Sequence, residues 1–161
     1  MNADLRMHTD RLGIWAMMPR PMADQDYKHA ELTERLIGIF FEVYNELGHG
    51  FLESVYEQAY VLVLTSKGIQ FQQQCPGNVM FRGANVGEFR ADLIAERAVI
   101  VEMKAVQKLD LSHEKQLLNY LRATNLEVGL LLNFGPSAQI RRLVLENERK
   151  RLRRSAAGSS L

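Results

Sequence analysis

The sequence has little of what holds small secreted proteins together. It contains one cysteine, Cys75, which cannot form an internal disulfide, and four scattered histidines that do not combine with it into a zinc cluster. No apolar run approaches the roughly 18 residues that cross a bilayer, and residues 1–20 lack the apolar core of a secretory signal. We therefore expect a cytoplasmic protein without a membrane-spanning segment, in a compartment that keeps thiols reduced.

An excess of one sign of charge is also missing. The 20 Lys and Arg side chains nearly balance 19 Asp and Glu, so the protein is not basic throughout. Positive charge gathers only in residues 141–154, which hold seven basic and two acidic side chains. Such an end can contact polyanions, although a solvated tail is the more common interpretation. The sequence also lacks a nucleophile elbow and a phosphate-cradling glycine loop.

The length of 161 residues suits one globular domain. We expect a loose arm at 1–27, one domain at 28–147, and a basic, disordered tail at 148–161. Apolar spacing predicts helices at 28–47, 52–67 and 112–124, the last capped by Ser112, and strands at 69–74, 79–81, 86–95, 98–106 and 128–134. Pro76-Gly77 is predicted to be a turn, and residues 139–145 fit either a strand or a short helix.

The order of these elements predicts an α/β fold. Strand 98–106, the helix after it and apolar strand 128–134 form one right-handed crossover unit, so the two strands are expected to be parallel. The sheet is therefore mixed, flanked by helices, with two neighbouring helices before it.

Three charged residues interrupt the strands that should be buried. Glu102 and Lys104 lie two apart in a run that is otherwise apolar, so the pleat directs both to one face. A buried charge costs several kcal/mol unless it is paired or bound to a metal. An ion pair between the two on a solvent-facing side would also explain them.

Asp92 lies on the preceding strand. If the turn takes residues 96–98, Ala95 pairs with Val99 and Asp92 with Glu102, which places two carboxylates face to face. Such a pair persists most easily around a divalent cation, and Mg²⁺ prefers a few carboxylates with water and phosphate. A two-residue turn would instead send the carboxylates to opposite faces.

Three further polar residues are candidates for the site. Glu53 is in the first turn of the second helix, where the helix dipole alone stabilises an acid. Gln116 and Tyr120 are four apart and share one helix face, which is a weak signal by itself.

Five motifs in order resemble a known group. They are G-x-x-E-x-x-Y at residues 50–56, FRADLI, the E-x-K of VEMKAV, HEKQLLNYL and GLLLNFG. Together, over about residues 30–145, they resemble the GxxExxY family within the PD-(D/E)XK nuclease-like superfamily. Gln116 and Tyr120 are similar to the Q-x-x-x-Y feature of its RecB-type branch. Ala91 stands where the superfamily name has proline.

The resemblance implies a restriction-endonuclease-like core with a Mg²⁺ or Mn²⁺ site. Its metal ligands would be Asp92, Glu102, the carbonyl of Met103 and Glu53. Lys104 would orient or activate the attacking water, while Gln116 and Tyr120 would position the substrate or that water.

The implied function is a metal-dependent nuclease, with DNA favoured over RNA as the substrate. A non-catalytic nucleic-acid-binding or assembly module that keeps the fold is the alternative. A structural protein with ion pairs alone is a third interpretation. A homo-oligomer is compatible with all three.

Overall fold

A computed structural model describes residues 27–151 of the chain. The predicted arm, apart from its last residue, and the end of the predicted tail lie outside this range. The elements in chain order are α1 (Ala30–Leu47), α2 (Glu53–Ser66), β1 (Phe71–Phe81), β2 (Ala84–Ala95), β3 (Val99–Lys104), α3 (Leu111–Ala123), β4 (Val128–Phe134) and β5 (Ala138–Val144). Within residues 27–151 no helix has the length and apolar character that a membrane span requires.

The two N-terminal helices pack together as their apolar stripes predict. Helix α1 ends at Gly48, whose φ of 67° is in the left-handed region that glycine adopts readily. A short loop then leads into α2. The hydroxyl of Tyr60 on α2 donates to the carbonyl of Leu36 on α1 at 2.8 Å, which satisfies both groups inside the core.

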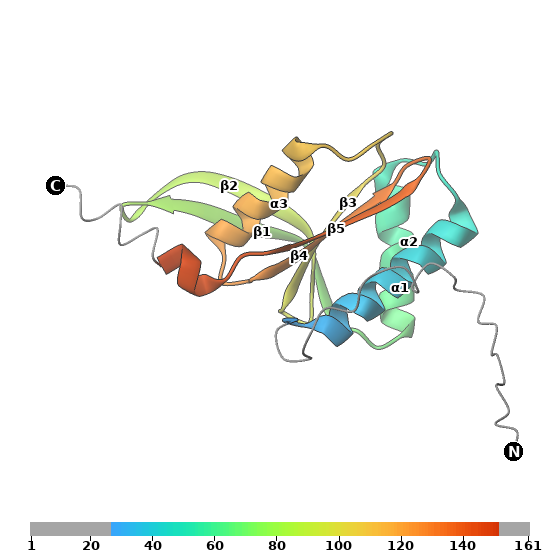
Figure 1. The fold of residues 1–161 in the computed structure, drawn as a ribbon, viewed down its shortest axis with the longest axis horizontal. Helices are drawn as coiled ribbons and strands as arrows, with labels where there is room; N and C mark the ends of the chain where they lie inside the picture. Colours follow the sequence, from blue (N-terminus) through green and yellow to red (C-terminus); the bar gives the residue numbers. More distant parts are fainter. Residues whose placement is uncertain (1–26, 152–161) are drawn as a thin grey trace, which may run out of the picture.

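The five strands form one mixed sheet in the order β1-β2-β3-β4-β5. Strands β3 and β4 are parallel and the other neighbours are antiparallel, so the predicted crossover through α3 is confirmed. Helices α1 and α2 cover one face of the sheet and α3 covers the other (Figure 1). Strands β1 and β2 extend as a long hairpin toward the left of the view.

Two local predictions are wrong. Pro76-Gly77 is not a turn, because β1 runs through it and Pro76 lies opposite Arg90. A proline is tolerated there because β1 is an edge strand and needs no amide donor on its outer side. The cap of α3 is Asp110 rather than Ser112, since the Asp110 carboxylate accepts from the amides of Ser112 and His113.

The C-terminal part of the described chain is ordered further than expected. The ambiguous segment 139–145 is strand β5, antiparallel to β4. Residues 147–151 form a helical turn within the region that we predicted to be disordered from residue 148. The Lys150 ammonium holds this turn by donating to the carbonyls of Thr124 and Leu126, at 3.0 and 2.6 Å.

Gly135, just after β4, gives a stability prediction. A Cβ added there would lie 2.0 Å from the backbone carbonyl oxygen of Val106, which cannot move without disturbing the loop after β3. We expect Gly135→Ala to lower the free energy of unfolding by about 1–3 kcal/mol. Gly87→Ala is the matched control, because the nearest atom to its Cβ is 3.8 Å away. Equal urea midpoints for the two variants would contradict this account.

Candidate active site

The predicted register between β2 and β3 is confirmed. Ala95 pairs with Val99 and Leu93 with Val101. The turn between them places Glu96 and Arg97 at φ of 48° and 54°, which gives the longer of the two connections considered from the sequence. Asp92 and Glu102 follow this pairing on their two strands, so their carboxylates converge.

Backbone pairing between β2 and β3 ends at Leu93 and Val101. Beyond this pair, the carboxylates of Asp92 and Glu102 each accept a hydrogen bond from a backbone amide of the neighbouring strand. The amide of Asp92 donates to Glu102 Oε1 at 3.2 Å, and the amide of Met103 donates to Asp92 Oδ2 at 2.8 Å. Each carboxylate therefore occupies the place of a backbone carbonyl. Beyond the last backbone pair, these side chain to backbone bonds join the two strands.

The carboxylate pair is short of positive charge. Glu102 is 1% exposed, and no ion pair within 4 Å reaches it or Asp92 in residues 27–151. Burial, and then the charge of Asp92, raises the pKa of Glu102 to about 8. Burial also raises the pKa of Asp92. Lys104 opposes both shifts through its charge, but the direct Glu102–Lys104 ion pair that the sequence left open is not formed.

The N-terminus of α2 adds acidic side chains to this region. Glu53 is the first residue of α2 and is half-buried. Burial raises its pKa, Lys104 lowers it and Asp92 raises it further, so all three groups share one electrostatic site. The structure therefore brings together four of the predicted side chains: Glu53, Asp92, Glu102 and Lys104.

Sequence reasoning missed Glu57. It lies one helical turn after Glu53, and its charge raises the pKa of both Asp92 and Glu53. Its carboxylate accepts hydrogen bonds from the side-chain amides of Gln73 and Gln74 on β1, at 3.2 and 2.9 Å. Glu57 thus connects α2 to the strand beside Asp92. The spacing of four from Glu53 was the signal that could have found it.

The carboxylates of Asp92 and Glu102 supply the kind of oxygen donors that Mg²⁺ and Mn²⁺ accept. Over residues 27–151 no group of three or more His, Cys, Asp or Glu side chains is placed to hold a metal ion. Two carboxylates remain, and Mg²⁺ accepts one or two of these and keeps several waters. Oxygen ligands also suit Mn²⁺. The roles of Glu53 and the Met103 carbonyl as further ligands stay predictions.

Gln116 and Tyr120 lie on α3, on the other face of the sheet from α2. The Gln116 amide donates to the Tyr120 hydroxyl at 2.7 Å. The Tyr120 ring stacks on Phe89 of β2 with a centroid distance of 4.5 Å. The pair is therefore fixed against β2 three residues from Asp92, and its part in binding substrate stays a prediction.

A mixed sheet flanked by helices, with converging carboxylates and a lysine on its central strands, defines a restriction-endonuclease-like α/β protein. The PD-(D/E)XK nuclease superfamily matches residues 30–143, and the chain belongs to it. These enzymes are generally nucleic-acid hydrolases that use divalent metals such as Mg²⁺.

Other comparisons are distant. No curated protein matches the chain. A solved structure titled "Crystal structure of SSO0001" is 15% identical, covering 83% of this chain and 88% of that one, with a TM-score of 0.42. The assignment therefore depends on the superfamily match alone.

Proposed function

We propose that this protein is a Mg²⁺- or Mn²⁺-dependent nuclease that hydrolyses phosphodiester bonds, with DNA as its substrate, and that it is a member of the GxxExxY group. One observation supports this most strongly. Half-buried Asp92 and buried Glu102 converge with no cation paired to them in the described chain. A structural role does not require two acids in such a place, whereas a divalent metal that binds a phosphate takes carboxylates as ligands.

Each residue of the site has a role in this chemistry. A divalent metal, when bound, lowers the pKa of a water and polarises the phosphoryl oxygen. Asp92 and Glu102 would hold it, with the Met103 carbonyl and Glu53 as further oxygen ligands. Lys104 would orient the attacking water and offset the negative charge that develops on the phosphate.

A cleavage assay tests the proposal directly. Wild-type protein with Mn²⁺ should cut single-stranded, duplex or branched DNA, and chelation should stop it. Lys104→Ala should slow cleavage by a factor on the order of 10²–10³, the usual effect of losing one preorganised electrostatic group. Lys115→Ala is the matched control, because Lys115 is exposed on α3.

The outcome separates the two functional classes. If wild type and Lys104→Ala both bind DNA in a salt-dependent way and neither cuts it, the chain is a non-catalytic binding module. If both cut equally, the activity belongs to a contaminant or to another site, and the proposal fails.

A further inference from the structure

A hollow of about 230 Å³ lies beside the candidate active site. It is bounded by the α1–α2 loop, the loop after β3 and the β4–β5 turn, with Phe51, Val106 and Gly135 on these three walls. Ala105 lines it and directly follows Lys104. An interaction with the Ala105 amide also lowers the pKa of Glu53, so the hollow and the acidic site share a border.

Two of its walls are each fixed by a tyrosine hydroxyl. Tyr56 donates to the Gly48 carbonyl at 2.9 Å and accepts from the Phe51 amide at 3.2 Å, which holds the α1–α2 loop. The Tyr44 hydroxyl lies 2.9 Å from the carbonyl oxygen of Gly135, which holds the β4–β5 turn. The final Tyr of the G-x-x-E-x-x-Y motif therefore shapes this hollow.

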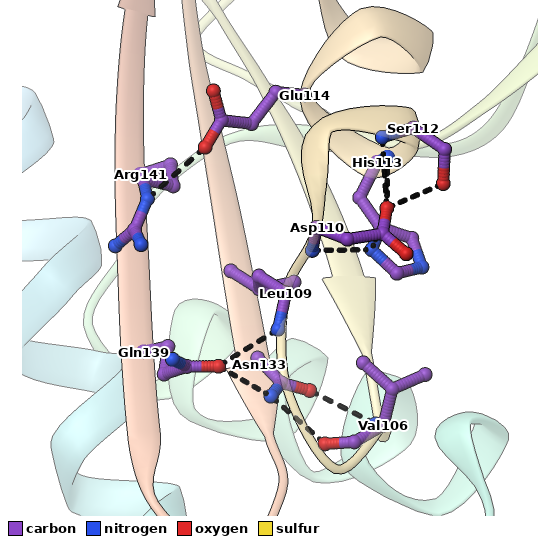
Figure 2. A network of polar contacts seen from close by, with 9 residues as sticks. All are labelled: Val106, Leu109, Asp110, Ser112, His113, Glu114, Asn133, Gln139 and Arg141. Atoms are coloured by element: carbon purple, nitrogen blue, oxygen red, sulfur yellow. Dashed lines mark hydrogen bonds and ion pairs between the residues drawn. The ribbon is translucent and has the colours of Figure 1, made fainter.

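The third wall is fixed by Asn133, a fully buried residue of β4. Its side chain accepts from the Val106 amide and donates to the Val106 carbonyl, both at 2.9 Å (Figure 2). Gln139 extends the network by accepting from the Leu109 amide at 2.8 Å. Because all three walls are fixed before any ligand arrives, binding in the hollow would cost little ordering entropy.

The lining selects a neutral, planar group. Among residues 27–151 the lining contains no Asp, Glu, Lys or Arg, so it offers no permanent positive charge to a phosphate. Phe51 is 51% exposed and offers an aromatic wall, while His49 and Gln107 add polar groups to the lining. The volume is below the roughly 300–1,000 Å³ of drug-sized pockets, which suits one ring system. The position at the carboxyl ends of parallel strands β3 and β4 is where open α/β sheets bind ligands.

We infer that this hollow binds one unpaired nucleobase of the nucleic acid whose phosphate lies at Lys104. The inference rests on the proposed function for the identity of the ligand. A base that is paired and stacked in a duplex cannot enter, so the preferred substrate is single-stranded or has an extruded nucleotide next to the bond that is cut. The Phe51 ring would stack on that base.

Equilibrium binding of a labelled single-stranded DNA oligonucleotide tests this, with chelator present so that nothing is cleaved. Phe51→Ala should weaken binding roughly 5- to 100-fold, the worth of one base–aromatic stack. Phe51→Leu, which keeps apolar bulk without the ring, should weaken it by an intermediate factor. Leu52→Ala is the matched control, because Leu52 is 77% exposed and does not line the hollow.

Oligonucleotides with one abasic position locate the base. One abasic position in the oligonucleotide should weaken binding by the wild-type protein as much as Phe51→Ala weakens binding of the intact oligonucleotide. The Phe51→Ala variant should bind the intact oligonucleotide and this abasic one with equal affinity. The inference is overturned if Phe51→Ala and Leu52→Ala bind equally, or if Phe51→Ala still responds fully to that abasic position.

The two proposals can fail separately. Cleavage with Mn²⁺ by a protein that is indifferent to Phe51 would refute the base site alone. Phe51-dependent binding without any cleavage would refute the nuclease proposal and leave the base site standing.

Discussion

Asp92→Asn should make the protein inactive and more stable at the same time. The amide oxygen can still accept from the Met103 amide, so the local fold is kept. The lost charge removes one metal ligand, and cleavage should fall by a factor on the order of 10²–10³. Above about pH 8, where Glu102 is ionised, the same change relieves the repulsion between the two carboxylates and should add roughly 1 kcal/mol to the free energy of unfolding without metal.

Metal titration calorimetry and thermal melts measure the two effects. Mn²⁺ binding should disappear in Asp92→Asn, while the melting temperature without metal should rise by about 2–4 °C. Glu88→Gln is the matched control, since Glu88 is exposed on the same strand and should change neither quantity. A structural Asp92 predicts the reverse, with unchanged metal binding and a lower melting temperature.

The convergence of Asp92 and Glu102 was predictable because it follows from short-range rules. Side chains on a strand alternate with period two, and the length of the connecting turn sets which residues face each other. Residues 96–98 provide that turn, and Ala95 pairs with Val99 across it. The parallel crossover followed likewise from an apolar strand, a helix and a second apolar strand.

The errors fall where partners distant in sequence decide. Proline and glycine at 76 and 77 locally favour a turn, but pairing of β1 with β2 keeps them in a strand. The cap of α3 is the exception, because its partners are local: the Asp110 carboxylate accepts from the amides of Ser112 and His113, so Asp110 is the cap in place of the predicted Ser112.

The hollow was invisible in the sequence for the same reason. One of its walls is held by the contact between Tyr44 and Gly135, which are 91 residues apart. No local period or motif predicts that contact. The Tyr of G-x-x-E-x-x-Y was part of a recognised pattern, but its two bonds to the preceding loop appear only in three dimensions.

The second large effect expected is a pH-dependent stabilisation by Mg²⁺. The pKa of Glu102 is raised in the folded protein to about 8, above its value of 4.5 in an unfolded chain, so the folded state binds more protons between these values. Stability without metal therefore falls as pH rises from about 5 to about 8, by up to roughly 1.4 kcal/mol per pH unit from this group. Well above pH 8, the stability that comes from the protonated Glu102 carboxyl is fully lost.

Mg²⁺ should reverse this loss, because it binds the ionised carboxylates and replaces the proton. Thermal melts with and without saturating Mg²⁺ should differ little near pH 5, where protons compete. Near pH 8 they should differ by about 2–3 kcal/mol, the gain from a ligand at roughly one hundred times its Kd. Mg²⁺ should therefore add the most stability near pH 8, where the ionised carboxylates lower the stability of the metal-free protein most.

Glu102→Gln identifies the responsible group. Its amide oxygen can still accept from the Asp92 amide, but it carries no charge at any pH. The variant should therefore lose most of the decline in stability between about pH 5 and about pH 8 and most of the stabilisation by Mg²⁺. Glu88→Gln should keep both. If Glu102→Gln retained the full decline in stability with pH, Glu102 would not be the origin of the pH dependence. The proposal that Mg²⁺ replaces the proton on Glu102 would then fail.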